Sequence, residues 1–385
     1  MTHTDAVVVG AGVIGASCAV HLARAGLRVT LVDRAPAPAA GSTGRATGGF
    51  RAQYATAINV KLSLLAREAL RRFHDDTGVD PGFQPVGYLW LATSAAALAE
   101  LAAANELQRR SGLHDAAIVT PNDVRAINPF VDSSGIVGGA WCPSDGVMRP
   151  TEILRGYLEL AARLGVDIRW GEPTIALPRR GARISAVLTP RASYSTGVVV
   201  NAAGAWAATV ADLAGVDLPI VPLRRQVAIT EPTTALPASS PMTIWVDDGF
   251  HLRVRDGRVL LLRPTPGDPD DPWSEQVEPA WLDDIAARAP VRVPALRGVA
   301  LDRAASWAGL YEMSPDHHAI LGWAPGCPNL LLVNGSSGHG VMHAPALGQL
   351  AAEIATSDGA RSLDVHALRP SRFAEGEPIR GSSLL

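Results

Sequence analysis

The sequence predicts an α/β fold, and three observations near its start lead to that prediction. Residues 6–9 form a short β-branched run typical of a buried strand, and the motif G-x-G-x-x-G follows directly at residues 10–15. Residues 17–25 then have helical spacing. A second strand at residues 28–32 leads into Asp33. Together these segments form a complete β-α-β unit of the Rossmann type, whereas the glycine motif alone would be a weak signal.

The three glycines of the motif have separate roles in such a unit. Gly10 permits the tight turn, Gly12 lets a pyrophosphate approach the backbone, and Gly15 lets the helix pack on the strand. Free N–H groups at the helix start favour a phosphate charge. Asp33 can accept hydrogen bonds from ribose hydroxyls. The sequence therefore predicts a dinucleotide site at this end of the chain.

Composition argues against several classes of protein. The chain has 385 residues, 47% of them hydrophobic, so we expect two domains or one elaborate domain. A net charge of −3 gives no electrostatic reason to expect a nucleic acid or an anionic membrane as partner. Cys18, Cys142 and Cys327 have neither metal-ligand nor disulfide spacing. Without a targeting signal or a transmembrane run, we expect a cytoplasmic protein, and we expect no metal.

Two further glycine-rich stretches stand beside predicted helices. Residues 41–51 (GSTGRATGGFR) indicate either backbone held close to a ligand or a flexible surface loop, and composition leaves both open. Residues 56–73 follow as an amphipathic helix. Residues 334–340 (NGSSGHG) lie between a strand and a helix predicted at 341–355. This second helix start can stabilise an anion at another part of the same ligand.

The middle of the chain changes pattern twice. Residues 82–142 resemble an inserted domain, and α/β patterning returns where Thr151 is expected to cap a helix. Residues 221–262 return to β patterning, and the tail after Asp358 is expected to be loosely ordered. The dinucleotide domain is therefore predicted to be discontinuous in sequence. Its segments are 1–78, 143–216 and 308–385, and a substrate domain comprises 79–142 and 217–307.

Asp256-Gly257 predicts a two-residue β-hairpin within the β-rich segment. Pairing across this turn places Arg253 opposite Leu260 and His251 opposite Leu262. The other face of the hairpin is apolar and should pack on helices. His251 and Arg253 therefore face either solvent or a cavity.

Five motifs together resemble the flavin amine oxidoreductases related to D-amino acid oxidase, glycine oxidase and sarcosine oxidase. The strongest resemblance is to the β-subunits of sarcosine oxidase and proline dehydrogenase. The motifs are GAGVIG at 10–15, GSTGRATGGFR at 41–51, VVNAAGAW at 199–206, YEMSPDHHAILG at 311–322 and GSSGHGVMHAPALG at 335–348. The resemblance implies a Rossmann-type FAD-binding domain and a mixed α+β substrate domain with a large antiparallel-rich sheet.

Carried over by position, the resemblance also implies which residues lie along FAD. They are Gly10, Gly12, Val13, Ile14, Gly15, Asp33, Arg34, Ser42, Thr43, Arg45, Thr47, Gly48, Gly49, Pro173, Ala203, Gly204, Trp206, Gly338, His339, Gly340, Val341 and Met342. The amides of residues 338–342 would lie at the pyrimidine edge of the flavin. There the helix start would stabilise the negative charge of the reduced form.

The same resemblance implies an FAD-dependent oxidoreductase that oxidises the C–N bond of an amino acid or secondary amine to an imine, by hydride transfer to flavin N5. Arg51 is the first candidate for binding a substrate carboxylate, since a guanidinium can hold it bidentately. His251, Arg253 and Met342 are the other catalytic candidates. A nicotinamide-dependent dehydrogenase, or a flavin-binding electron-transfer subunit that needs a partner, remains an alternative.

The chain departs from the family pattern at three places. Gly309 stands where monomeric sarcosine oxidases attach FAD through a cysteine, so we expect FAD to be non-covalent. Val341 and Met342 replace a lysine that helps hold the substrate carboxylate. Residues 259–262 are apolar where an oxygen-activating lysine would be expected. The electron acceptor is therefore open between O₂ and a quinone or partner protein, and we expect slow reoxidation by O₂.

Overall fold

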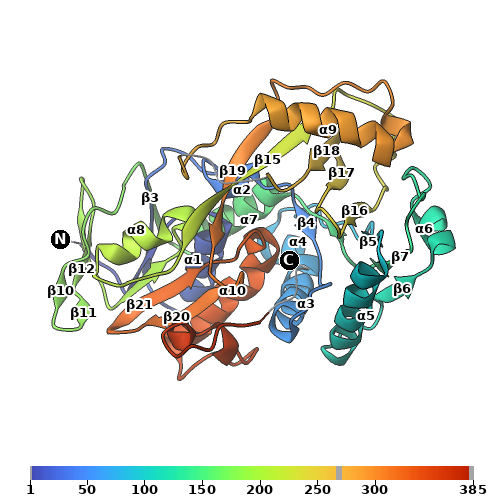
Figure 1. Ribbon diagram of the computed structural model, residues 1–385. Helices are drawn as coiled ribbons and strands as arrows, with labels where there is room; N and C mark the ends of the chain where they lie inside the picture. Colours follow the sequence, from blue (N-terminus) through green and yellow to red (C-terminus); the bar gives the residue numbers. More distant parts are fainter. Residues whose placement is uncertain (1, 266–270, 381–385) are drawn as a thin grey trace.

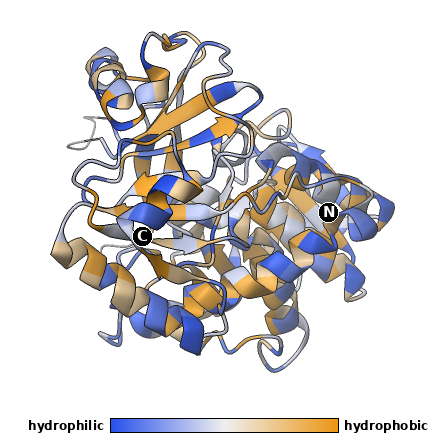
Figure 2. Ribbon diagram, turned by 90° about the vertical axis from the view of Figure 1, so that its right-hand side faces the viewer, coloured by the Kyte–Doolittle hydropathy of each residue, from blue (hydrophilic) through white to orange (hydrophobic). Residues whose placement is uncertain are grey.

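Two large β-sheets organise the molecule, and the chain passes between them several times (Figure 1). The computed structural model describes residues 2–265 and 271–380. Figure 2 shows hydrophobic residues concentrated in the strands, while hydrophilic residues lie along the outer helices.

The first sheet has six strands in the order β20-β21-β14-β2-β3-β9. Neighbouring strands are parallel except β20, which runs antiparallel to β21. They are β2 (Ala6–Val9), β3 (Val29–Asp33), β9 (Asp167–Trp170), β14 (Val198–Asn201), β20 (Ile320–Ala324) and β21 (Cys327–Asn334). These strands come from the start, middle and end of the chain, which confirms a discontinuous Rossmann-type domain. Its boundaries stay a prediction.

Both faces of this sheet are covered, which explains why its central strands β2 and β14 are nearly continuous apolar runs. Ala6 and Val8 of β2 face one core, whereas Val7 and Val9 face another. The first core is shared with helices α1 (Val13–Arg24), α3 (Ala57–Arg71), α4 (Phe73–Thr77), α7 (Pro150–Arg163) and α10 (Gly340–Thr356). The second core includes residues of α8 (Ala207–Asp212).

The second sheet has eight strands in the order β19-β15-β18-β17-β16-β5-β7-β6. Only the β5–β16 pair is parallel, so the expected antiparallel-rich sheet is confirmed. The strands are β5 (Tyr88–Ala92), β6 (Ala117–Val119), β7 (Gly138–Cys142), β15 (Val221–Ile229), β16 (Met242–Trp245), β17 (His251–Arg255), β18 (Arg258–Leu262) and β19 (Trp307–Met313). Helices α6 (Pro121–Ile127) and α9 (Pro279–Arg292) pack on one face, and α5 (Ala95–Arg110) packs at the β5–β7 end of the other.

Short elements complete the fold. A three-stranded sheet has the order β1-β13-β12, and two further pairs are β4–β8 and β10–β11. Their bounds are β1 (Thr2–His3), β4 (Gly49–Phe50), β8 (Gly146–Val147), β10 (Arg179–Arg180), β11 (Arg183–Ile184), β12 (Ala186–Leu188) and β13 (Ser193–Ser195). The short helices are α2 (Ser42–Arg45), η1 (Gly204–Trp206), η2 (Pro294–Leu296), η3 (His366–Leu368) and η4 (Pro370–Arg372).

The hairpin predicted at Asp256-Gly257 is confirmed. Both turn residues have positive φ, 52° and 70°, as a tight two-residue turn requires. Arg253 pairs with Leu260 and His251 with Leu262, in the predicted register. The apolar face of the hairpin packs with α9, so His251 and Arg253 lie on the opposite face.

Two local predictions were wrong. Helix α7 begins at Pro150, with Arg149 at the N-cap, so Thr151 lies inside the helix and does not cap it. Proline is favoured at the first helical position, because the backbone N–H of that position has no partner within the helix and proline has no N–H to leave unpaired. The tail is not loosely ordered over its described part. Arg372 is fully buried and its guanidinium donates to both carboxylate oxygens of Asp316, at 2.8 and 2.9 Å. This long-range ion pair has no local signal in the sequence.

Within the described residues, no helix has both the length and the apolar character needed to cross a membrane. The same part of the chain contains no group of three or more potential metal ligands. Cys18, Cys142 and Cys327 are buried free thiols, and burial raises the pKa of Cys18 to about 12. The cytoplasmic location stays a prediction.

Candidate cofactor site and active site

The turn between β2 and α1 is too crowded for side chains at two motif glycines. Gly10 has φ 99°, and a Cβ there would lie 2.5 Å from the Ala202 carbonyl oxygen. A Cβ on Gly15 would lie 1.8 Å from the Gly10 carbonyl oxygen. Strand β14 therefore ends directly against the turn, and Ala203 and Gly204 follow beside it.

The second glycine-rich loop contacts the start of α1. The Val13 N–H donates to Thr43 Oγ1 at 3.1 Å, and a Cβ on Gly12 would lie 3.3 Å from the same oxygen. Ile14 is buried in the next position of the helix. Residues 41–51 are thus packed against the first motif, so the interpretation as a flexible surface loop was wrong.

Strands of the eight-stranded sheet hold this second loop in place. Ser42 Oγ donates to the Leu310 carbonyl at 2.6 Å, and Trp307 Nε1 donates to the Arg45 carbonyl at 2.8 Å. Arg253 Nη1 donates to the Gly48 carbonyl at 2.7 Å and also to the Thr47 carbonyl. The side chain of Arg253 therefore joins the two domains of the molecule.

Glycine at positions 48 and 49 lets this contact form. Gly48 has φ 79°, and a Cβ there would lie 2.9 Å from Arg253 Nη1. A Cβ on Gly49 would lie 2.8 Å from the sulfur of Met242. Arg253 is buried with 4% exposure, so it faces the interior and not solvent. Its role in catalysis stays a prediction, because its observed partners are backbone carbonyls.

Asp33 is bonded to the backbone of the first loop. Its carboxylate accepts from the Ala11 N–H at 2.6 Å and from the Ala35 N–H at 2.7 Å. Each oxygen keeps a second lone pair that a ribose hydroxyl can use. Asp33 therefore also shapes the loop, a role that the sequence did not predict.

Three of the residues expected to lie along FAD gather at the ends of β3, β9 and β14. The Arg34 guanidinium lies 3.7 Å from the centre of the Trp206 ring. Trp206 in turn stacks on Trp273, with ring centres 5.5 Å apart. Pro173 follows Glu172, whose N–H donates to the Asp33 carbonyl at 2.8 Å. The structure thus brings Arg34, Pro173 and Trp206 to neighbouring strand ends.

The third glycine-rich loop links β21 to α10 and contacts β19. Gly338 has φ 93°, and a Cβ there would lie 2.4 Å from the Tyr311 ring. The Ser336 N–H donates to Glu312 Oε1 at 3.2 Å. Burial raises the pKa of Glu312 to about 7. Glu312 was not among the candidates predicted from sequence, although a single acid within the apolar strand pattern of residues 307–313 was an available signal.

Buried polar atoms without a hydrogen-bond partner test whether these loops fit FAD. Such atoms occur at several places within the described residues, and among them are Glu312 (Oε2), Asn334 (both amide atoms) and Ser336 (Oγ). All three residues lie on or beside the third glycine-rich loop. Helices α1 and α10 begin at Val13 and Gly340, beside glycine-rich loops whose backbone a ligand can approach closely. Together with the unpartnered polar atoms, these helix starts provide the hydrogen-bonding surface that a dinucleotide needs. The residues present therefore fit FAD.

Arg51 is the best-placed catalytic candidate. It is buried with 6% exposure, and its guanidinium lies 4.4 Å from the Tyr54 ring centre and 4.8 Å from that of Trp90. Its Nη2 lies 3.1 Å from His339 Nε2. Met342 is nearby, since its sulfur accepts from the Tyr54 hydroxyl at 3.1 Å. Tyr54, which was not among the candidates predicted from sequence, thus connects Arg51 to the start of α10.

His251 belongs to the same surroundings but makes a local contact. Its Nδ1 lies 2.8 Å from the Gly249 carbonyl. Burial above all, together with the positive charges of Arg51 and Arg225, lowers the pKa of His251 to about 4 against the opposing effect of its bond to the Gly249 carbonyl. His251 is therefore neutral at pH 7.

Val341 continues α10 after Gly340 and is half-buried.

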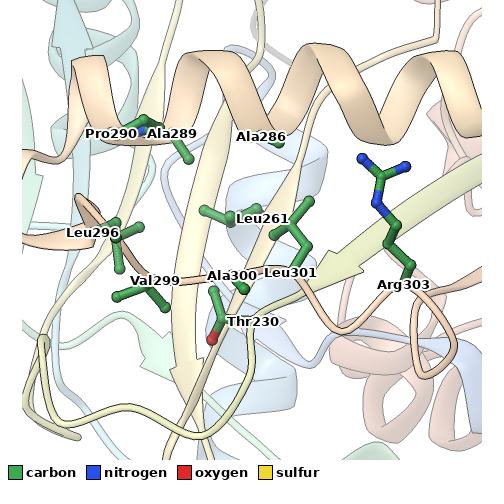
Figure 3. Close-up of a pocket in the computed structure, with 11 residues that line it drawn as sticks. Thr230, Leu261, Ala286, Ala289, Pro290, Leu296, Val299, Ala300, Leu301 and Arg303 are labelled. Atoms are coloured by element: carbon green, nitrogen blue, oxygen red, sulfur yellow. The ribbon is translucent and has the colours of Figure 1, made fainter.

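A separate pocket of about 340 Å³ lies between α9 and the eight-stranded sheet (Figure 3). Its lining includes Thr230, Leu261 and Arg303, and Leu261 points to the α9 face of the sheet. Arg51, His251 and Arg253 lie on the other face. This pocket is therefore not part of the candidate active site.

Comparison with known proteins shows the family. The chain matches the DAO family, described as FAD dependent oxidoreductase, over residues 5–354. FAD-dependent oxidoreductase domain-containing protein 1 of Xenopus laevis is 27% identical over 98% of this chain and 84% of its own length. 4-Methylaminobutanoate oxidase (formaldehyde-forming) of Paenarthrobacter nicotinovorans is 29% identical over 97% of this chain, which spans 46% of that protein.

Solved structures agree with that result. L-Proline dehydrogenase from P. horikoshii has a TM-score of 0.91 at 27% identity, covering 98% of this chain and 100% of that one. Glycine oxidase from Geobacillus kaustophilus has a TM-score of 0.85 at 21% identity, over 97% and 99% of the two chains, which shows likeness of fold. The family match covers most of the chain and confirms both the resemblance and the cofactor, so the protein belongs to the DAO family of FAD-dependent oxidoreductases.

Proposed function

We propose that the protein oxidises the C–N bond of an amino acid or of a secondary amine that carries a carboxylate. The observation that carries this proposal is the buried guanidinium of Arg51, whose Nη1 has no partner among the described residues. A buried charged group without its hydrogen bonds is costly. A substrate carboxylate would supply a charge-assisted hydrogen bond to that nitrogen.

The names of two relatives support the same class of substrate. 4-Methylaminobutanoate and L-proline, in the names of an oxidase and a dehydrogenase, are both secondary amines with a carboxylate. One of these relatives is named an oxidase and the other a dehydrogenase, so their names do not agree on the electron acceptor. The substrate class is therefore better supported than the electron acceptor.

FAD held by the glycine-rich loops would supply an acceptor for the hydride of the carbon next to the substrate nitrogen. The chain's own residues orient the substrate. Arg51 would hold the carboxylate, so the adjacent C–H bond points in one direction. The rings of Tyr54 and Trp90 pack on the guanidinium and exclude water from it. His251 is neutral, and with Nδ1 donating to Gly249 its Nε2 keeps a lone pair for the substrate amine.

Replacing Arg51 by Gln tests the proposal. We expect KM for a carboxylate substrate to rise by about 10- to 150-fold, since a hydrogen bond to a charged group contributes about 1.5–3 kcal/mol. Substrates are found by anaerobic bleaching of the 450 nm flavin band with amino acids and N-methyl amino acids. Arg51→Lys is the matched control, because lysine keeps the positive charge but lacks the planar guanidinium that can donate two parallel hydrogen bonds to a carboxylate.

The flavin content of the same variants separates the two possible roles of Arg51. If Arg51→Gln purifies with a full complement of FAD and a raised KM, Arg51 binds the substrate. If it purifies without FAD, Arg51 serves the cofactor and its assignment to the carboxylate fails. Failure of every carboxylate-bearing amine to bleach the wild-type flavin would contradict the substrate class itself.

A further inference from the structure

The contact between Arg51 and His339 joins two loops that are far apart in the sequence. Arg51 follows β4, and His339 is the N-cap residue of α10. Arg51 Nη2 and His339 Nε2 are 3.1 Å apart, and the two side chains are buried with 6% and 7% exposure. Water therefore does not compete with this hydrogen bond.

The chemistry of the two groups determines which one donates. A guanidinium has only donors, so the lone pair must be on His339 Nε2 and the ring proton on Nδ1. His339 is thus a neutral imidazole in one tautomer. Burial, the positive charge of Arg51 and the nearby His343, His318 and His317 lower the pKa of His339 well below its usual value.

Aromatic rings restrict the same guanidinium in the other directions. Tyr54 and Trp90 pack against it, and the Tyr54 ring also meets the His339 ring edge-on, with centres 4.9 Å apart. Nη2 is held by His339, whereas Nη1 has no partner among the described residues. The hydrogen bond to His339 therefore determines which edge of the guanidinium remains for a ligand.

We propose that His339 is a positioning residue that holds Arg51 in the orientation needed to bind a substrate carboxylate. His339 acts as a neutral acceptor and need not touch the substrate. This inference rests on the proposed function, in which Arg51 is the carboxylate-binding group. Removing the acceptor should lower affinity for anionic ligands selectively, because the guanidinium then loses its preferred orientation.

The test compares a carboxylate ligand with its neutral isostere in the holoenzyme. The dissociation constants of benzoate and benzamide are measured from the changes that each causes in the flavin absorption spectrum. His339→Leu should weaken benzoate binding about tenfold, or about 1.4 kcal/mol, and leave benzamide nearly unchanged. His339→Gln should restore benzoate binding, because its amide oxygen can reach the place of Nε2 and accept from Arg51.

Two further variants make the test specific. His339→Asn places its amide near the position of Nδ1, too far from Arg51 to accept its hydrogen bond. It should therefore weaken benzoate binding as His339→Leu is expected to, and it provides the test if the Leu variant loses FAD. His343→Gln is the matched control: this buried histidine lies one turn later on α10, and its Nε2 is 2.8 Å from the Ser63 hydroxyl. We expect His343→Gln to keep the wild-type ratio of benzoate to benzamide affinity.

Arg51→Gln distinguishes failure of this inference from failure of the proposed function. If Arg51→Gln abolishes the preference for benzoate but His339→Leu and His339→Asn keep it, the positioning role is wrong and the proposed function stands. Equal weakening of both ligands in the His339 variants likewise overturns the positioning role. If Arg51→Gln keeps the preference, Arg51 is not the carboxylate site and both proposals fail.

Discussion

At the scale of single residues, burial near the third glycine-rich loop makes a carboxyl group hold its proton. The pKa of Glu312 is about 7 in the folded protein, against an ordinary value of 4.5, because the group is buried. The folded state therefore binds more protons than the unfolded state between these two values. This contribution to stability is present below pH 4.5 and is lost as the pH rises through 7.

Replacing Glu312 by Gln should remove that part of the pH dependence. A shift of this size corresponds to about 3 kcal/mol, at about 1.4 kcal/mol for each pKa unit. Between pH 5 and 7.5, the free energy of unfolding of the wild type should therefore fall relative to that of Glu312→Gln by about 2 kcal/mol, because the unfolded carboxyl is already partly ionised at pH 5 and the folded carboxyl is not yet fully ionised at pH 7.5. Urea unfolding measures it. Asp145, whose pKa burial also raises to about 7, is present in both proteins and cancels. Parallel pH profiles would contradict the prediction.

Gly309 should make the cofactor removable. It faces the second glycine-rich loop, where a Cβ would lie 2.9 Å from Arg45 Cβ, and it has no side chain that can form a covalent bond to FAD. Acid precipitation should release all yellow colour into the supernatant. Colour that stays on the washed pellet would show covalent attachment and refute the prediction.

At the scale of elements, each glycine-rich loop brings backbone close to a helix start. Gly12 has no positive φ, and an added Cβ would be 3.3 Å from Thr43 Oγ1, so alanine fits with a small shift. Its methyl group would nevertheless fill the approach to the start of α1. Gly12→Ala should therefore fold but bind FAD weakly. Gly197→Ala is the control, because its Cβ would make an ordinary contact of 3.7 Å.

The ratio of absorbance at 280 and 450 nm, with a circular dichroism spectrum, measures this outcome. We expect Gly197→Ala to carry FAD like the wild type and Gly12→Ala to lose it with an unchanged circular dichroism spectrum. A Gly12→Ala protein with full flavin content would show that the pyrophosphate does not approach this backbone.

At the scale of the whole molecule, the C-terminal tail is joined to the first domain by the buried Arg372–Asp316 pair, with side-chain exposures of 0% and 2%. Arg372→Met leaves the Asp316 carboxylate buried without its cation and should cost about 3–5 kcal/mol. The double variant Arg372→Met/Asp316→Asn should cost less, because no buried charge remains. Urea unfolding of both proteins tests this, and equal costs would count against a charge effect.

The charge inventory of the whole chain bears on the electron acceptor. Lys61, exposed on α3, is the only lysine among the 385 residues. A fixed cation beside the flavin favours electron transfer to O₂. His251 and His339 are neutral at pH 7, so only the guanidinium groups of Arg51 and Arg253 carry positive charge there, and both are held by hydrogen bonds to His339 and to loop carbonyls. A guanidinium spreads its charge over three nitrogens, unlike the compact charge of a lysine ammonium. We therefore expect slow reoxidation by air and faster turnover with a quinone or dye. Stopped-flow mixing of photoreduced enzyme with aerated buffer measures it, and oxidase-like reoxidation would contradict it.

The sequence by itself determined the features that depend on neighbours in the chain. The β-branched run before the first glycine motif became β2, and the turn Asp256-Gly257 set the register that pairs Arg253 with Leu260. Such features follow from local sterics: positive φ in tight turns, close backbone approach at glycine, and the two-residue period of strands. The motif order then indicated the family and its cofactor.

Tertiary structure decided what depends on residues far apart in sequence. His339 lies 288 positions from Arg51, and Arg253 contacts a carbonyl 205 positions away. The ion pair that anchors the tail joins residues 56 positions apart. In each case the side chain's role depends on which partner burial brings within hydrogen-bond distance. The sequence around a charged residue does not show which partner it will have. The partner is brought close, and the competing water is removed, only when distant segments of the chain pack together.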